Sequence, residues 1–101
     1  MIISVYMNKT IHTNCPIAKT AQLLSDSWTM LIIRDLLGSS MRFCEIETSL
    51  DGISSRTLAL KLKRLEEEKI IKKSELYYSL TAQGKKLKKV IDAMESWGKT
   101  L

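Results

Sequence analysis

The feature that most constrains the fold of this chain is a change of hydrophobic period near residue 70. Up to residue 69, apolar residues recur every three or four positions, which is typical of amphipathic α-helices. Two β-prone runs follow at 70–74 and 76–80, and the second alternates between apolar and polar residues. A last helical pattern begins after Thr81, which is suited to capping it. We therefore expect a mainly helical domain with one small β-hairpin.

Two helices are predicted first. Pro16 suits the first position of a helix, because proline already has a helical φ and its missing N–H would find no partner there. The next helix runs from Trp28 to about Leu37, with either Asp26 or Ser27 as its N-cap. Gly38 follows directly, as is typical of a helix end.

A helix-turn-helix pattern comes next. A short helix is predicted around Ile46, and it stops at the turn dipeptide Asp51-Gly52. Ser54 then caps a longer helix that runs to about Lys69, with leucines at helical spacing on one face. A short helix, a tight turn and a longer capped helix form a helix-turn-helix motif. With a hairpin directly after it, the order is that of a winged helix, an α+β arrangement.

The 101 residues contain no repeat, linker or low-complexity tract, so a single domain is predicted over 1–101. Within it we expect an N-terminal arm at 1–14, the helix-turn-helix at 42–69, a short wing at 70–80 and a C-terminal helix at 81–100. Met7 is an alternative start of the chain.

The charge distribution favours a polyanionic partner. The net charge is +5, and residues 54–101 hold twelve basic side chains against six acidic ones. A basic half on a small domain suggests that the partner is a nucleic acid. A lysine-rich solubilising face is the alternative interpretation.

A series of short segments matches a known family over about residues 15–98. In chain order these are Cys15-Pro16-Ile17, residues 28–37, Arg42-Phe43-Cys44-Glu45-Ile46, residues 52–58, Leu62, Leu65-Glu66, Ile70-Ile71, Tyr78-Ser79-Leu80-Thr81 with Gly84, and Trp97-Gly98. Together they resemble the HxlR family of winged helix-turn-helix transcription regulators. The resemblance implies a sequence-specific regulator of transcription that binds double-stranded DNA as a homodimer. The chain departs from the family pattern in two places. Its wing, around Ser74-Glu75-Leu76, is shorter than is usual in the family, and Asp26-Ser27 stands in place of a glycine–lysine pair.

The predicted recognition helix at about 54–69 supplies most of the candidate DNA contacts. Arg56 suits a bidentate contact to guanine, and Ala59 and Leu60 suit thymine methyl groups. Hydroxyl groups can bond bases or phosphates, and lysines and arginines can neutralise phosphates. The full candidate set is Arg42, Ser54, Ser55, Arg56, Thr57, Ala59, Leu60, Lys61, Lys63, Arg64, Lys72 and Lys73. Whether the short wing reaches an adjacent minor groove stays open.

The last predicted helix carries an apolar stripe that a domain of this size can barely cover. The resemblance implies dimerisation through the first and last helices. The candidate interface residues are therefore Ile17, Val90, Ile91, Met94 and Trp97. Packing of the stripe on its own domain is the alternative.

Two cysteines receive different interpretations. The positive end of a helix favours the thiolate form, so Cys15 is a candidate redox or aldehyde sensor. The resemblance adds that some relatives sense electrophiles at this position, whereas simple packing is the alternative. Cys44 is interpreted as structural.

Several function classes find no support in the sequence. One histidine, His12, and two distant cysteines give no metal-ligand spacing, so no metal or other cofactor is expected. No catalytic motif is present, and an enzyme is not predicted. Without an export signal or a long apolar run, a cytoplasmic location is expected. A small-molecule or oxidant effector stays open, and a winged-helix module that binds a partner protein instead of DNA is the alternative function.

Overall fold

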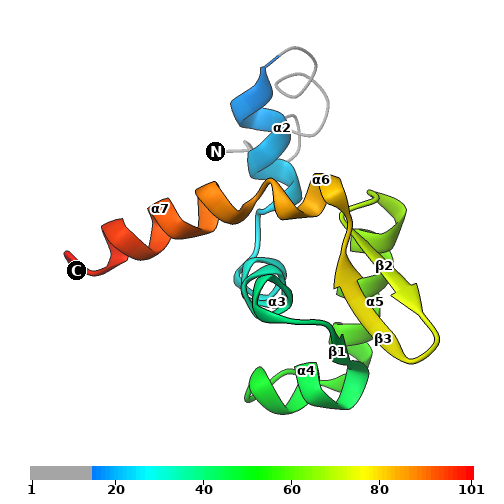
Figure 1. The fold of residues 1–101 in the computed structure, drawn as a ribbon. Coiled ribbons are helices and arrows are strands. Elements are labelled where there is room, and N and C mark those ends of the chain that lie inside the picture. Colours follow the sequence, from blue (N-terminus) through cyan, green and yellow to red (C-terminus); the bar gives the residue numbers. More distant parts are fainter. Residues whose placement is uncertain (1–14) are drawn as a thin grey trace, which may run out of the picture.

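The computed structural model describes residues 15–101, and the predicted arm at 1–14, Met7 and His12 lie outside the described residues. The elements follow the predicted order (Figure 1). They are α2 (Pro16–Leu23), α3 (Ser27–Gly38), β1 (Met41–Arg42), α4 (Phe43–Ser49), α5 (Ser55–Glu67), β2 (Ile71–Ser74), β3 (Tyr77–Leu80), α6 (Ala82–Lys85) and α7 (Lys88–Gly98). The predicted fold class, mainly α with a small β wing, is confirmed.

Side-chain caps set where the helices begin. Of the two candidates for α3, Asp26 is the N-cap, and its carboxylate accepts a hydrogen bond from the Thr29 N–H at 2.8 Å. Ser54 caps α5 as predicted, with the Thr57 N–H 3.0 Å from its Oγ. Thr81 caps α6 in the same way through the Gly84 N–H. These caps satisfy backbone donors that have no partner inside the helix.

The structure differs from the prediction in two elements. The wing sheet has three strands in the order β1-β3-β2, because Met41 and Arg42 pair with Tyr78 and Tyr77. A two-residue strand is too short to produce a periodic sequence signal. The last helix is also divided into α6 and α7, because the Leu87 N–H bonds the Gly84 carbonyl, a tight turn that interrupts the α-helical pattern.

The hydrophobic core lies between α3, α4, α5 and the inner face of the sheet. Its fully buried side chains come from all three helices and are Ile32, Ile33, Ile46, Leu58, Leu62 and Leu65. Ile71, Tyr78 and Leu80 close it from the sheet. The alternation along β3 puts Tyr78 and Leu80 inside and Tyr77 outside, as a pleated strand requires. The core therefore fixes the helix-turn-helix against the wing.

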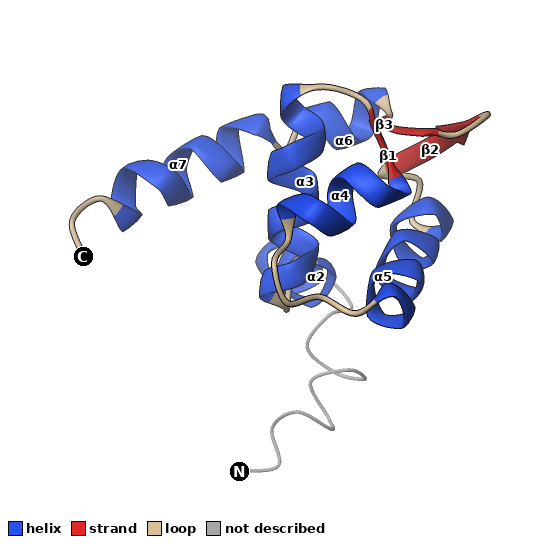
Figure 2. Ribbon diagram, turned by 90° about the horizontal axis from the view of Figure 1, so that it is seen from below, coloured by secondary structure: helices blue, strands red, loops and turns tan. Residues whose placement is uncertain are grey.

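Two helices lie at the edge of this core. Neither α2 nor α7 has a buried residue, and α7 extends away from the rest of the domain (Figures 1 and 2). None of the helices in residues 15–101 combines the length and apolar character needed to cross a membrane.

Candidate nucleic-acid interface

The predicted recognition helix α5 has one face buried in the core and an opposite, solvent-exposed face, which we call the free face. Leu58, Leu62 and Leu65 are at most 1% exposed, so they fix the helix to the core. The exposed side chains on the opposite face include Arg56, Ala59, Leu60 and Lys63, with Glu67 at its C-terminal end. Leu60 is 59% exposed, which is costly for a leucine without a partner. Arg56 and Lys63 have no polar partner within residues 15–101, so the N-terminal and middle parts of this face are available to a ligand.

Three hydroxyl residues in the predicted DNA-contact set have partners inside the protein. The Ser54 hydroxyl donates to Thr57 Oγ1 at 2.9 Å and accepts the Thr57 N–H. The Ser55 hydroxyl donates to Glu47 Oε2 on α4. These hydrogen bonds stabilise the first turn of α5, and the Ser55 bond also connects the two helices of the motif.

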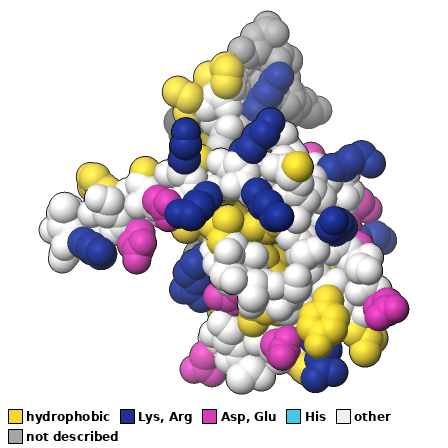
Figure 3. All heavy atoms as spheres, viewed as in Figure 1, with side chains coloured by type: hydrophobic (Ala, Val, Ile, Leu, Met, Phe, Trp, Pro, Cys, Tyr) yellow, Lys and Arg dark blue, Asp and Glu magenta, His cyan; other side chains and the backbone are white. Residues whose placement is uncertain are grey.

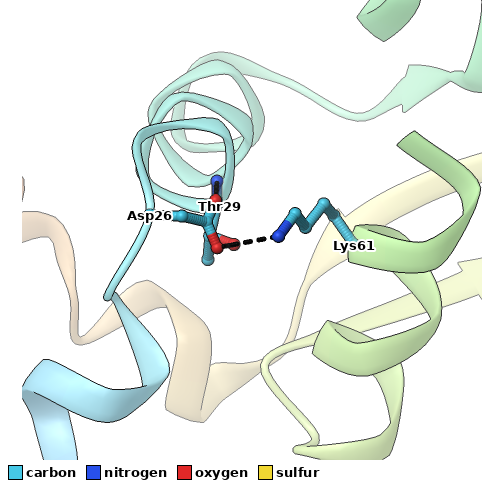
Figure 4. A network of polar contacts seen from close by, with 3 residues as sticks. All are labelled: Asp26, Thr29 and Lys61. Atoms are coloured by element: carbon cyan, nitrogen blue, oxygen red, sulfur yellow. Dashed lines mark hydrogen bonds and ion pairs between the residues drawn. The ribbon is translucent and has the colours of Figure 1, made fainter. Parts of the chain in front are cut away.

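Lys61 also has an internal partner. Its Nζ lies 3.0 Å from Asp26 Oδ2, and the two side chains are 30% and 32% exposed (Figure 4). The Thr29 hydroxyl donates to the same carboxylate oxygen at 3.0 Å. The predicted phosphate ligand Lys61 therefore connects the middle of α5 to the first turn of α3.

The protonation of Asp26 reflects this network. Burial raises the pKa of this carboxyl, but hydrogen bonds from Thr29 and Lys61, with the Lys61 charge, outweigh burial and hold the pKa below its usual 3.8. A depressed pKa means that the folded state favours the carboxylate. This stabilisation is complete at pH values above the pKa of Asp26 in the unfolded state. It is lost as the pH falls through the pKa of Asp26 in the folded state.

Replacing Asp26 by alanine is expected to lower the free energy of unfolding by about 1–2 kcal/mol at neutral pH, because a helix cap and a partly buried ion pair are both lost. Urea denaturation measures the loss. The difference from the unchanged protein should shrink when the measurement is repeated at about pH 3, where the carboxylate is being protonated. Lys61→Met, which keeps the cap, should show a smaller loss. Equal stability of all three proteins at neutral pH would contradict a structural role for the network.

A second pair of basic side chains meets at the base of the wing. Arg42 and Lys73 line a cleft of about 270 Å³ together with Phe43, Cys44, Leu76 and Tyr78. The Lys73 ammonium lies 5.3 Å from the centre of the Tyr78 ring, a distance at which a cation and an aromatic face attract. The structure thus brings together two predicted phosphate ligands from the helix-turn-helix and the wing.

Two other candidates lie apart from the free face of α5. Arg64 lines a cleft of about 320 Å³ beside α2, next to Lys19 and Glu68. Lys72 points to the outer face of the sheet, in a cleft with Lys85. The predicted basic set is therefore distributed over several surfaces.

An apolar surface lies on α2 and α7. Ile17 is 80% exposed and Trp97 66% exposed, and Val90 and Met94 are exposed on the same α7 helix. Ile17, Met30 and Met94 also line an open apolar groove of about 400 Å³. Ile91, the fifth predicted interface residue, is partly buried and packs against the core of its own chain. Leu101, which the sequence pattern did not single out, adds a further exposed apolar side chain.

Both cysteines are free thiols on the surface. Cys15 is the N-cap of α2, and the Ala18 N–H lies 3.4 Å from its sulfur. Cys44 is exposed in the cleft at the base of the wing rather than packed in the core. Within residues 15–101, no cluster of His, Cys, Asp or Glu is placed to hold a metal ion.

Sequence reasoning missed the partners that hold the helix-turn-helix in place. Asp26 was identified only as a possible cap, and Glu47 was not singled out at all. Their partners are 35 and 8 residues away in sequence, so no local spacing reveals them. Only the folded packing of α3, α4 and α5 brings these groups together.

Comparison with known proteins adds independent information. A model of the HxlR-like helix-turn-helix family matches residues 23–101. The uncharacterised HTH-type transcriptional regulator YvaP of Bacillus subtilis is 37% identical over 91 residues, which cover 82% of this chain and 84% of YvaP. The HTH-type transcriptional regulator YodB of the same organism is 35% identical over 94 residues, covering 85% of this chain and 84% of YodB.

Solved structures show the same fold. The quinone-bound YodB from B. subtilis superposes with a TM-score of 0.80 and 34% identity, covering 86% of this chain and all of that one. The redox regulator HypR in its oxidised form gives a TM-score of 0.80 with 26% identity, covering 86% of this chain and 97% of HypR.

Proposed function

Because the chain belongs to the HxlR-like helix-turn-helix family, we propose that it regulates transcription as a homodimer that reads operator DNA with α5 in the major groove. The observation that carries this proposal is the free face of α5. Arg56, Ala59, Leu60 and Lys63 are exposed on a helix whose opposite face is anchored in the core. An arginine at the start of such a helix, with apolar residues one turn further along, matches the chemistry of base edges in the major groove.

The basic side chains outside this face supply affinity without sequence choice. Arg42 and Lys73 lie together at the base of the wing, where they are suited to one stretch of phosphate backbone. On the free face itself, we assign Lys63 to a phosphate and Arg56 to a base. We assign Ser54, Ser55, Thr57 and Lys61 to positioning α5, since their polar groups already have partners in the chain.

Binding to duplex DNA tests the proposed function directly. Fluorescence anisotropy on the reduced protein at physiological salt should compare the DNA upstream of its own coding sequence with scrambled duplex of equal length. A preference of about 1000-fold lies in the range of specific regulators and supports a local operator. Weak, equal binding to every duplex that hardly changes with salt would favour a protein-interaction module instead.

The exposed apolar surface of α2 and α7 supports the homodimer. Trp97 and Ile17 are the most exposed large apolar side chains of these two helices, and an uncovered surface of this kind marks an interaction site. A symmetric dimer would cover the same surface on both copies. It would also place the two α5 helices to contact two DNA half-sites. These half-sites would lie about one DNA turn, roughly 34 Å, apart, or a multiple of that distance.

Replacing Trp97 by alanine is expected to weaken the dimer. Each copy loses a buried aromatic anchor, worth about 2 kcal/mol or more, so the dimer dissociation constant should rise by roughly a thousandfold. Sedimentation velocity over a range of protein concentrations measures the change. Glu95→Ala, on the same exposed helix, serves as the control and should leave the dimer intact. An unchanged dimer in the Trp97 variant would exclude this surface as the interface.

Cys15 supports a finer proposal, that oxidants or other electrophiles regulate the protein. The thiol is exposed at the first turn of α2, beside the proposed dimer surface, so a modification there would alter that surface. The same anisotropy assay with and without a thiol oxidant tests this, with Cys15→Ser as the variant. A response that survives in Cys15→Ser would exclude the thiol as the sensor. A cytoplasmic location, where thiols stay reduced, fits this proposal.

A further inference from the structure

A polar cleft of about 380 Å³ lies on the outer face of the wing sheet, apart from the free face of α5. Its rim is formed by Ser39 and Ser40 after α3, Lys72 on β2, Ser79 on β3 and Lys85 on α6. Lys72 and Ser79 are direct partners in the β2–β3 pairing, so their side chains stand next to each other on one face of the sheet. Figure 3 shows basic side chains gathered over α6 and the start of α7 on this side of the molecule.

The rim consists of cations and hydroxyl groups with no carboxylate among them. The ion pairs of residues 15–101 involve neither Lys72 nor Lys85. The three serine hydroxyls likewise make no hydrogen bond within the described part of the chain. Two unpaired ammonium groups and three free hydroxyl donors on one cleft produce a positive potential and several hydrogen-bond donors for an anion.

The same mainly polar cleft also has a small apolar part. Leu36 and Leu80 line it and are each 4% exposed, so their side chains are held by the core. Leu37 adds a partly buried apolar side chain. A small apolar patch beside cations and hydroxyl groups suits a molecule with both characters, and a volume of this size is in the range of small-molecule sites.

We propose that this cleft binds a small organic anion whose apolar body contacts the leucines and whose anionic group is bound by Lys72 and Lys85. The serine hydroxyls would supply additional hydrogen bonds to the anionic oxygens. The occupant would touch α3, both wing strands and α6, which leads into α7. As an effector it would therefore connect the wing with the proposed dimerisation helix. That effector role rests on the proposed DNA-binding function, whereas binding of the anion does not.

Isothermal titration calorimetry of the full chain with benzoate and phenyl phosphate tests the proposal. Both ligands join an anionic group to an apolar ring, so we expect saturable binding. Lys72→Gln and Lys85→Gln should each weaken it by about tenfold or more, because each removes a charge-assisted hydrogen bond. Lys99→Gln makes the same charge change outside the cleft and should leave binding unchanged. Benzamide, which is neutral, should bind far more weakly than benzoate.

Several outcomes would overturn this inference. One is the absence of saturation at about 10 mM ligand, well above the dissociation constant of a weak complex. Another is equally tight binding of inorganic phosphate, which would show general attraction to lysines without any contact to the leucines. A third is loss of duplex affinity in both lysine variants with anion binding unchanged, which would assign the lysines to DNA. Duplex binding without any anion binding would refute this site alone, and anion binding without duplex binding would refute only the proposed function.

Discussion

Replacing Arg56 by alanine is expected to weaken binding to the cognate operator by about 1–3 kcal/mol and to relax selectivity at one base pair. Arg56 is exposed in the first turn of α5, the part of a recognition helix that usually meets base edges. Its guanidinium has no ion pair or hydrogen bond within residues 15–101. Truncation would therefore remove the proposed DNA contact and break no interaction within the described residues.

The measurement is anisotropy on the operator and on a set of duplexes with single base changes. Lys63→Ala provides the matched control, since it lies on the same face but is assigned to phosphate. It should weaken binding to all duplexes similarly. The slope of the logarithm of the binding constant against the logarithm of the salt concentration should become smaller by about one, because one counterion fewer is released. If Arg56→Ala also weakened every duplex by the same factor, Arg56 would be a phosphate contact and would not read a base.

The helices of this fold could be predicted from sequence because their signals are local. The turn Asp51-Gly52 follows the end of α4, Ser54 caps α5, and the leucines of α5 point inward at the predicted spacing. Strand β1 could not be predicted, because Met41 and Arg42 become a strand only by pairing with β3. A two-residue segment has no period of its own, so its structure is decided by a partner more than thirty residues away.

The candidate site was predicted less completely than the fold. Exposure along α5 follows from helical geometry, and Arg56, Ala59, Leu60 and Lys63, which were predicted as DNA contacts, are all exposed. Which polar groups are free on that helix depends on tertiary contacts. Ser55 meets Glu47 and Lys61 meets Asp26, and neither contact has a signature in local spacing. A hydroxyl or ammonium group that looks available in sequence can thus already be engaged in holding the helix.

The junction between the wing and α6 shows the same dependence on distant contacts. Thr81 donates its N–H to the Ile70 carbonyl at 3.0 Å and its hydroxyl to the Lys69 carbonyl at 2.7 Å. Its hydroxyl oxygen also accepts the Gly84 N–H at 3.0 Å. These bonds hold the first turn of α6 directly against the backbone that connects α5 to β2. The close approach explains why glycine occupies position 84, three residues after the cap.

Replacing Gly84 by alanine is therefore expected to destabilise the domain strongly. A Cβ at this position would lie 2.1 Å from the Ile70 carbonyl oxygen and 3.1 Å from Leu80 Cδ2. The Ile70 oxygen cannot move away freely, because it accepts the Thr81 N–H. Overpacking against backbone costs about 3 kcal/mol, a large part of the roughly 5–15 kcal/mol that stabilises a domain. The thermal midpoint should fall by more than about 10 °C.

Thermal unfolding followed by circular dichroism measures this change, at one fixed protein concentration because association also stabilises the fold. Gly38→Ala is the matched control, since a Cβ at Gly38 meets no atom within 4 Å and the residue ends α3. That variant should be as stable as the unchanged protein or slightly more stable, because alanine favours a helix more than glycine does. Similar midpoints for the two alanine variants would show that α6 can move away from Ile70. The junction would then be a flexible connection between the wing and α7, and Gly84 would have no packing role.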